Sequence, residues 1–241
     1  MGIYKTAILV AKSNFMRWKK DGRIFLTFFL MIVLMIRYFN GLSIFGIKYH
    51  TKITPFLLSI ALTDCDVTNG LLKILICFGW VCIICDVPVR DSFLTYTILR
   101  SGRKGWWLGE NIYICTAAFL YTVFLMIVPI LIMFPSLSIN ELWGSTIMQV
   151  MQSNEYQIEY LGNLVLPQKI IAMIYPYGAQ ILSFFAAWLQ FWFLGMVIYS
   201  INFCCKNNTI GIATVVFLIL LDPVVSYCGA YMSTKWMYKF S

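Results

Sequence analysis

Side chains that could hold a metal or carry out redox chemistry are few in this sequence. His50 is its single histidine, whereas a zinc or iron site gathers several imidazole or thiolate ligands. Cys82 and Cys85 have the CxxC spacing of redox and metal sites, but they end an apolar run and no second pair follows. We therefore interpret the eight cysteines as small core or lipid-facing residues and expect no metal site.

Catalytic groups are also missing from the sequence. A P-loop needs GxxxxGK followed by Ser or Thr, and the SGRKG stretch at Ser101 has the wrong glycine spacing. An intramembrane enzyme would need paired carboxylates or a serine beside a base, and neither is evident. The sequence therefore predicts a chain that is not an enzyme and that binds no cofactor itself.

Four polar residues in apolar stretches are candidates for lining a pathway across a membrane. Burying a charge at the bilayer centre costs about 2.5 to 3.5 kcal/mol on insertion scales, which singles out Asp222 beside Pro223. Tyr177, Gln180 and Gln190 follow one another in a single apolar stretch. The alternatives are a polar kink facing another helix for Asp222 and interfacial anchoring for the aromatic residue. Three further charged residues are expected near span ends, either as side chains that snorkel to the interface or as groups on the loop side: Arg37, Lys73 and Glu110.

The composition explains why a membrane is expected. Of the 241 residues, 61% are apolar and only 12% are charged, and the mean hydropathy is +0.80. Soluble domains use about a quarter of their residues as charges, so a cytosolic enzyme is excluded. Long uninterrupted apolar runs favour helices over a barrel, because a helix satisfies its own backbone in lipid. The sequence predicts an all-α, polytopic helical membrane protein.

Five apolar runs are long enough to be spans, and about five to six transmembrane helices are expected in a single transmembrane domain, 24–241. The expected spans are 24–38, 71–84, 112–134, 177–201 and 209–231. The run 170–205 carries no charge, and either it holds one span with a helical approach or it hides a sixth. Residues 53–62 are too short to cross and are expected to form an interfacial segment.

The basic residues indicate the orientation. They gather before the first span and between the second and third, whereas the long outer loop 135–168 has none. The positive-inside rule therefore places the N-terminus in the cytoplasm. This placement accounts for the net charge of +8 without a nucleic acid. In residues 1–23, Ile8, Ala11, Phe15 and Trp18 recur at helical spacing, which predicts a basic amphipathic interfacial helix that lies against membrane lipids.

The cytoplasmic loop 89–107 has more pattern than a connector needs. Pro88 stops the second span, and Asp91 or Ser92 can cap a short helix over Phe93 to Leu99 that Ser101 and Gly102 end. The basic residues of this loop suit anionic headgroups or an acidic partner surface, and its two tryptophans suit an interface: Arg100, Arg103 and Lys104; Trp106 and Trp107.

This loop resembles that of the membrane (permease) subunits of type-2 ABC exporters. In that family an acidic residue and a short amphipathic helix follow the second span. A turn of leucine, arginine or proline, a small residue and arginine comes next, and an aromatic residue and a glycine then open the third span. The matching residues are Asp91, Thr97, Leu99, Arg100, Ser101, Arg103, Trp106, Gly109 and Glu110.

The resemblance implies a specific assignment of parts. Residues 91–103 would be a coupling helix that docks on an ABC ATPase subunit, and residues 1–23 would be an elbow helix. The residues expected to contact the ATPase are Asp91, Phe93, Tyr96, Leu99, Arg100 and Arg103. ATP and magnesium would be bound by that partner ATPase, and a second permease subunit, the same or related, would complete the transporter.

Two alternatives remain beside a complete exporter subunit. Family members usually have six spans, so either 170–205 hides the sixth or this chain is a shortened member. A non-transporting multi-pass accessory or immunity protein would share the composition, the spans and the charge bias. Such a protein has no need of an amphipathic helix that ends in Arg100 to Arg103 and faces the cytoplasm.

Overall fold

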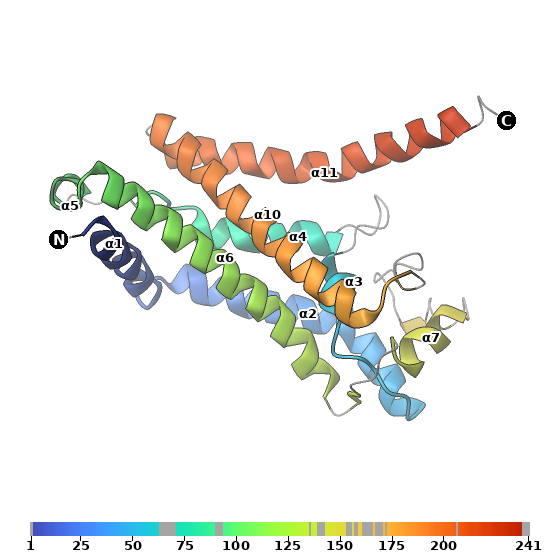
Figure 1. Cartoon of the computed structure of the whole chain (residues 1–241). Coiled ribbons are helices and arrows are strands. Elements are labelled where there is room, and N and C mark those ends of the chain that lie inside the picture. Colours follow the sequence, from blue (N-terminus) through green and yellow to red (C-terminus); the bar gives the residue numbers. More distant parts are fainter. Residues whose placement is uncertain are drawn as a thin grey trace. The chain divides into compact units, whose positions relative to one another are not determined.

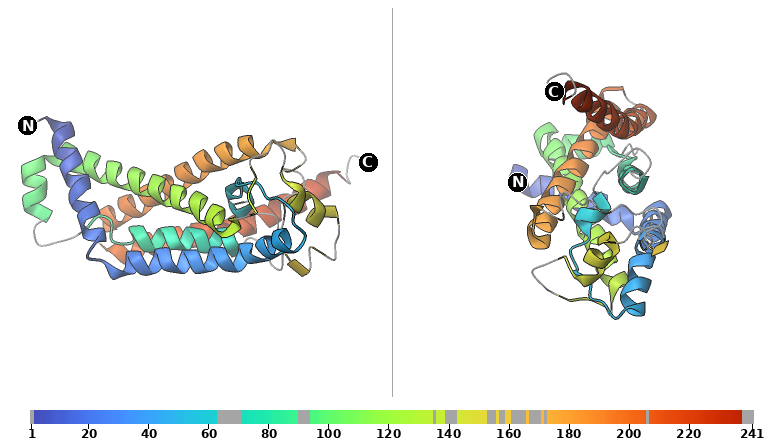
Figure 2. Two further views of the ribbon diagram at one scale, coloured as in Figure 1. Left: turned by 90° about the horizontal axis from the view of Figure 1, so that it is seen from below. Right: turned by 90° about the vertical axis from the view of Figure 1, so that its right-hand side faces the viewer.

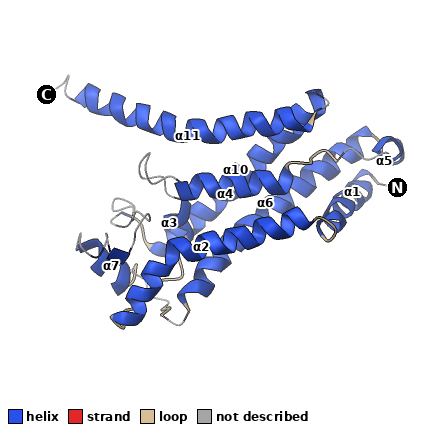
Figure 3. Cartoon of the chain, turned by 180° about the vertical axis from the view of Figure 1, so that it is seen from behind, coloured by secondary structure: helices blue, strands red, loops and turns tan. Residues whose placement is uncertain are grey.

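The computed structural model describes residues 2–62, 71–89, 94–134, 136–138, 143–152, 156, 159–160, 166, 171, 173–205 and 207–237, with the side chains of 94–95 and 226–237 left out. The elements in these residues are helices, and the sole β-type pairing among them is an isolated bridge between Ile53 and Leu137 (Figure 3). The prediction of an all-helical class is confirmed for the described part of the chain.

Four described helices are long and apolar enough to cross a membrane: α2 (Gly22–Lys48), α6 (Arg103–Met133), α10 (Pro176–Cys205) and α11 (Asn208–Met237), the last through its apolar part 208–225. At 1.5 Å per residue each exceeds or approaches the roughly 30 Å of hydrocarbon. In the most apolar windows of α2 and α11 only 22% and 17% of residues are buried within the protein. Because so much apolar surface needs a lipid environment, the chain is a multi-pass membrane protein.

The structure places the end of α2 and the start of α6 at other residues than the expected spans do. α2 continues past 38 to Lys48, and α6 begins at Arg103 rather than at 112, so residues 103–107 of the expected loop are helical. No proline interrupts residues 103–112, and the glycines within them, Gly105 and Gly109, continue the helix and lie where α1 packs on α6. α10 is one unbroken helix, so residues 176–205 do not contain two crossings.

The remaining helices are shorter. α4 (Leu71–Ile84) has the bounds expected for the second span, but its 14 residues reach only about 21 Å. α1 (Ile3–Trp18) lies in the expected interfacial segment, and α3 (Leu58–Leu62) is one turn of 53–62. The last two are α5 (Leu94–Ser101), described with the site, and α7 (Ser145–Gln152), in the expected outer loop.

The described chain groups into two compact units, and each long helix contributes residues to both. The first unit comprises 1–31, 77–122 and 188–217, and the second comprises 32–76, 123–187 and 218–241. The core of the first unit is aromatic: the rings of Trp80, Tyr121 and Phe191 lie 5.2 to 5.7 Å apart, and all three residues are buried. The core of the second unit centres on Phe45, 4.5 Å from the ring of Tyr49.

A buried asparagine fastens the ends of two long helices in the first unit. Asn202 of α10 donates through Nδ2 to the carbonyl of Val87 at 2.8 Å, and its Oδ1 accepts from the amide of Gly211 in α11 at 3.0 Å. The residue is 0% exposed, so both of its polar atoms use protein partners. These two hydrogen bonds hold the segment after α4 next to the point where α10 ends and α11 begins.

Candidate functional site

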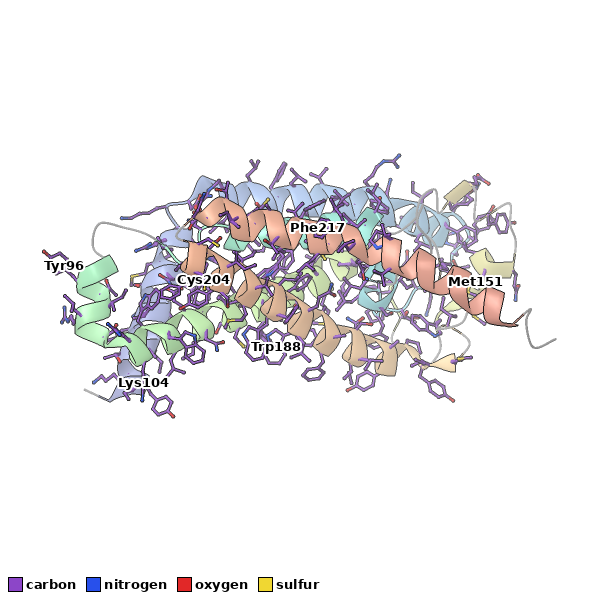
Figure 4. The ribbon with its side chains drawn as sticks, turned by 90° about the horizontal axis from the view of Figure 1, so that it is seen from above. Tyr96, Lys104, Met151, Trp188, Cys204 and Phe217 are labelled. Carbon is purple, nitrogen blue, oxygen red and sulfur yellow. The ribbon has the colours of Figure 1, made fainter. Side chains whose placement is uncertain are left out.

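α5 presents an exposed face made of apolar and basic side chains. Tyr96, Leu99 and Arg100 follow the i, i+3, i+4 spacing of one helix face, and Arg103 follows the turn at Gly102 as the first residue of α6. Tyr96 is 71% exposed and Leu99 is 76% exposed, and both arginines are exposed as well. Figure 4 shows Tyr96 pointing away from the rest of the ribbon. We call these four residues the α5 face.

α5 ends at Ser101 because of two local hydrogen bonds and the positive φ of Gly102. The hydroxyl of Ser101 donates to the carbonyl of Thr97 at 2.7 Å, and the amide of Gly102 donates to the carbonyl of Ile98 at 2.9 Å. Gly102 has φ of +74°, which favours glycine and stops the helix. α6 begins at the next residue, and α5 also contacts α1 (Figure 1). The α5 face is therefore held by two other helices of the first unit.

Two expected contact residues, Asp91 and Phe93, lie outside the described residues.

The two tryptophans expected to be interfacial anchors differ in their exposure. Trp106 is 5% exposed and packs on α10, with its ring 5.8 Å from that of Phe203, whereas Trp107 is 46% exposed. Trp106 is therefore a packing residue, and Trp107 keeps the exposure that an interfacial anchor needs.

α1 packs closely on the first turns of α6 because α6 has glycines there. A Cβ on Gly109 would lie 2.6 Å from Cβ of Val10 and 2.8 Å from the carbonyl oxygen of Ala7. A Cβ on Gly105 would lie 2.8 Å from Oγ1 of Thr6. The buried face of α1 is thus its small-residue face, Ala7, Val10, Ala11 and Asn14. Ile8, expected on the apolar face, is 58% exposed.

A buried carboxyl group lies in this α1–α6 contact. Asn14 donates through Nδ2 to Oε1 of Glu110 at 3.0 Å, and the two residues are 5% and 3% exposed. Oε2 of Glu110 is buried and has no hydrogen-bond partner among the described residues. The expectation that Glu110 lies on the loop side of a span end is therefore wrong. Because α6 starts early, position 110 falls on its α1-facing side.

Aromatic residues continue the α1–α6 contact beyond Glu110. The indole nitrogen of Trp18 donates to the hydroxyl of Tyr113 at 2.8 Å, and the ring of Phe15 lies 4.9 Å from that of Tyr113. Edge-to-face pairs of this kind add about 0.5 to 1.5 kcal/mol each beyond burial. The C-terminal end of α1 is thereby fixed to α6.

The turn after α1 is held by a charged cluster. Arg23, at the start of α2, binds Asp21 with Nη2 to Oδ2 at 2.5 Å and also pairs with Asp86, which follows α4. The hydrogen bond from Arg23 lowers the pKa of Asp21, so this carboxylate stays charged through the neutral range. Cys85 accepts from Nη1 of Arg23 at 3.2 Å.

Cys85 is expected to be a slow nucleophile. Burial, followed by the charge of Asp86, raises the pKa of its thiol to about 11. At pH 8 the thiolate fraction is then about a hundredfold below that of an ordinary thiol, and the labelling rate should rise about tenfold per pH unit. Maleimide labelling of a variant that retains only Cys85, against one that retains only the exposed Cys204, measures this. Equal rates at pH 8 would contradict the expectation.

Three of the expected pathway residues, Gln180, Tyr177 and Gln190, contact residues of their own unit. In the second unit, Gln180 is 6% exposed and its Oε1 accepts from the amide of Leu58 at 3.2 Å. The ring of Tyr177 lies 5.9 Å from that of Phe56. Gln190, in the first unit, is exposed, with Nε2 3.9 Å from Sγ of Cys77.

Asp222 forms an ion pair in the second unit. Its Oδ2 lies 2.5 Å from Nζ of Lys73, and the side chains are 47% and 19% exposed. The sequence placed Lys73 at a loop-side span end and Asp222 without a partner. The pairing joins α4 and α11, which are far apart in the chain, so no local pattern could have revealed it.

The polar contacts between α6 and α10 were likewise not expected. Trp192 donates through its indole nitrogen to Oδ1 of Asn111 at 3.0 Å, and Trp188, labelled in Figure 4, donates to the carbonyl of Cys115 at 3.1 Å. The available signal was the four-residue spacing of the tryptophans and of their partners. This spacing places each pair on one face of its own helix, but only the structure shows that the two faces meet.

Comparison of the chain with models of protein families, with curated proteins and with solved structures gives no match. The arrangement in the first unit therefore has to be interpreted by its own chemistry. That arrangement is an exposed apolar and basic helix face attached to a membrane-spanning helix.

Proposed function

We propose that this chain is the membrane-spanning permease subunit of an ABC transporter of exporter type, driven by a separate ATPase chain that docks on residues 91–103. In this proposal α1 is the elbow helix, the N-terminus is cytoplasmic, and the membrane is the inner membrane of a bacterial-type cell. Five spans are proposed, with α4 as the second, and the unbroken α10 supports this number over six. A second permease subunit and the ATPase, with its ATP and magnesium, complete the transporter.

The α5 face is the single observation that carries this proposal. Tyr96 and Leu99 are large apolar side chains, more than two-thirds exposed, on a helix too short to span a membrane. Interfaces are enriched in aromatic and arginine side chains, which is the composition of this face. An acidic-rimmed groove on a partner would take both the apolar centre and the arginines.

The connection from α5 to α6 supports a role in transmitting movement. One residue, Gly102, separates α5 from α6, and α1 contacts both. A displacement of α5 by a partner therefore reaches a spanning helix through one glycine and through the close contact at Gly109. A flexible loop between the two would lose this coupling.

The test is capture of the ATPase from native membranes. The protein, tagged at its N-terminus and extracted gently, should bring down a P-loop ATPase. The variant Leu99→Asp/Arg103→Glu should lose it, because the α5 face then carries two acidic groups in place of an apolar and a basic one. Charge reversal at an interface costs several kcal/mol, so at least a tenfold loss is expected.

A matched control exists on α1. Ile8 and Lys12 are also an exposed aliphatic and an exposed basic residue four positions apart, so Ile8→Asp/Lys12→Glu makes the same chemical change elsewhere. This control should keep the ATPase. Absence of any ATPase with the wild type, under conditions that preserve other membrane complexes, would instead favour the accessory or immunity protein.

A further inference from the structure

The chain turns from α1 into α2 at residues 19–21 (Figure 2). A cavity of about 680 Å³ lies at this turn, and all the residues that line it belong to the first unit. Its size is in the range of small-molecule sites. Aromatic, aliphatic and charged residues line this cavity, together with one glycine: Trp18, Lys19, Lys20, Asp21, Gly22, Ile24, Phe25 and Phe28.

The charge in this cavity favours an anion. Lys19 and Lys20 are both exposed and lie in the turn itself. The one carboxylate among the lining residues, Asp21, is bound by Arg23 through Oδ1 and Oδ2. Arg23 also pairs with Asp86, so these three side chains together carry one net negative charge, and the two ammonium groups of Lys19 and Lys20 leave the turn with one net positive charge.

The other half of the lining favours hydrocarbon. Phe25 is 82% exposed and Phe28 is partly exposed, and both stand on the first turns of a helix that is apolar enough to span a membrane. A free anion such as phosphate would make no use of the exposed ring of Phe25, whereas an acyl chain can pack on it. The ring of Phe28 lies 6.1 Å from that of Trp18 and 6.2 Å from that of Tyr121, so it continues the apolar side of the lining. Trp18, which also lines the cavity, is held in place by the hydrogen bond from its indole nitrogen to the hydroxyl of Tyr113.

We propose that this cavity binds an anionic glycerophospholipid, with its phosphate at Lys19 and Lys20 and the start of its acyl chains along Phe25 and Phe28. The bound lipid fills the corner between α1 and α2 and fixes their angle at the membrane surface. The proposal needs only that the chain is a membrane protein, and it does not depend on a transporter role.

The test uses the purified full chain in nanodiscs of equal phosphatidylglycerol and phosphatidylcholine, followed by native mass spectrometry of retained lipid. The wild type should keep phosphatidylglycerol over phosphatidylcholine. Lys19→Gln/Lys20→Gln should weaken this retention about tenfold or more, at about 1 kcal/mol per basic residue near the surface. Lys5→Gln/Lys12→Gln removes the same charge from exposed sites on α1 outside the cavity and should keep it.

A second pair of variants tests the apolar half. Phe25→Ser should reduce retention of the lipid severalfold, whereas Phe29→Ser, equally near the surface and 61% exposed but outside the lining, should not. Equal loss in both lysine variants would mean a diffuse charge effect and would overturn the site. Displacement by inorganic phosphate as efficient as that by short-chain phosphatidylglycerol would identify a simple anion site and would also overturn it.

Discussion

Gly109→Leu is expected to separate α1 from α6 and to destabilise the protein by about 3 kcal/mol, the upper part of the usual range for overpacking. The Cβ would already lie 2.6 Å from Cβ of Val10 and 2.8 Å from a backbone oxygen, and the backbone of α1 cannot yield as a flexible side chain could. The measurement is the unfolding temperature in detergent, together with proteolysis of α1.

The control for this variant uses a second helical glycine. A Cβ on Gly178 of α10 would make only an ordinary contact, 3.6 Å from Ile174. Leucine forms helix better than glycine by up to about 1 kcal/mol, so Gly178→Leu should leave stability unchanged or raise it. Opposite signs for the two variants are expected, and a loss of equal size in both would contradict the close α1–α6 contact.

Asn14→Leu is expected to cost about 3 kcal/mol, because it removes the sole described hydrogen-bond donor of a buried carboxyl group. Glu110→Leu should cost less than Asn14→Leu, since a neutral amide is cheaper to leave unpaired than a carboxylate. The double variant Asn14→Leu/Glu110→Leu should recover most of the stability, because two apolar side chains can replace a buried polar pair at little cost.

A double-mutant cycle on unfolding measures this coupling. An interaction energy of about 2 kcal/mol or more is expected for residues in direct contact. Additive losses would mean that Asn14 and Glu110 act independently, and the buried pair would then not hold α1 in place. Glu110→Gln serves as the conservative control, because its amide oxygen can still accept the hydrogen bond from Asn14.

Local patterns were enough for much of the helical structure. The short helix expected over Phe93 to Leu99 is found as Leu94–Ser101, and the glycine expected to end it has the positive φ that does so. α4 has the expected bounds. These features depend on residues within one or two turns of each other, which hydrophobic runs, prolines and glycines record directly. The start at Arg103 was missed because a helix turn with basic residues and a glycine looks like a loop when only hydropathy is followed. The end at Lys48 was missed because the charge of Arg37 suggests the end of a span, although apolar residues such as Phe39 and Phe45 continue the helix.

The sequence by itself determined that this protein is helical, that several helices are apolar enough to cross a membrane, and that a basic, amphipathic helix lies between 89 and 107. The tertiary structure decided which face of α1 is buried, that Glu110 lies under Asn14, and that Asp222 pairs with Lys73. The partners in these two pairs are 96 and 149 positions apart. Apolar runs indicate which segments lie away from water. The residue that a given side chain contacts is decided by packing between segments far apart in the chain, and this packing has no periodic pattern in a single sequence.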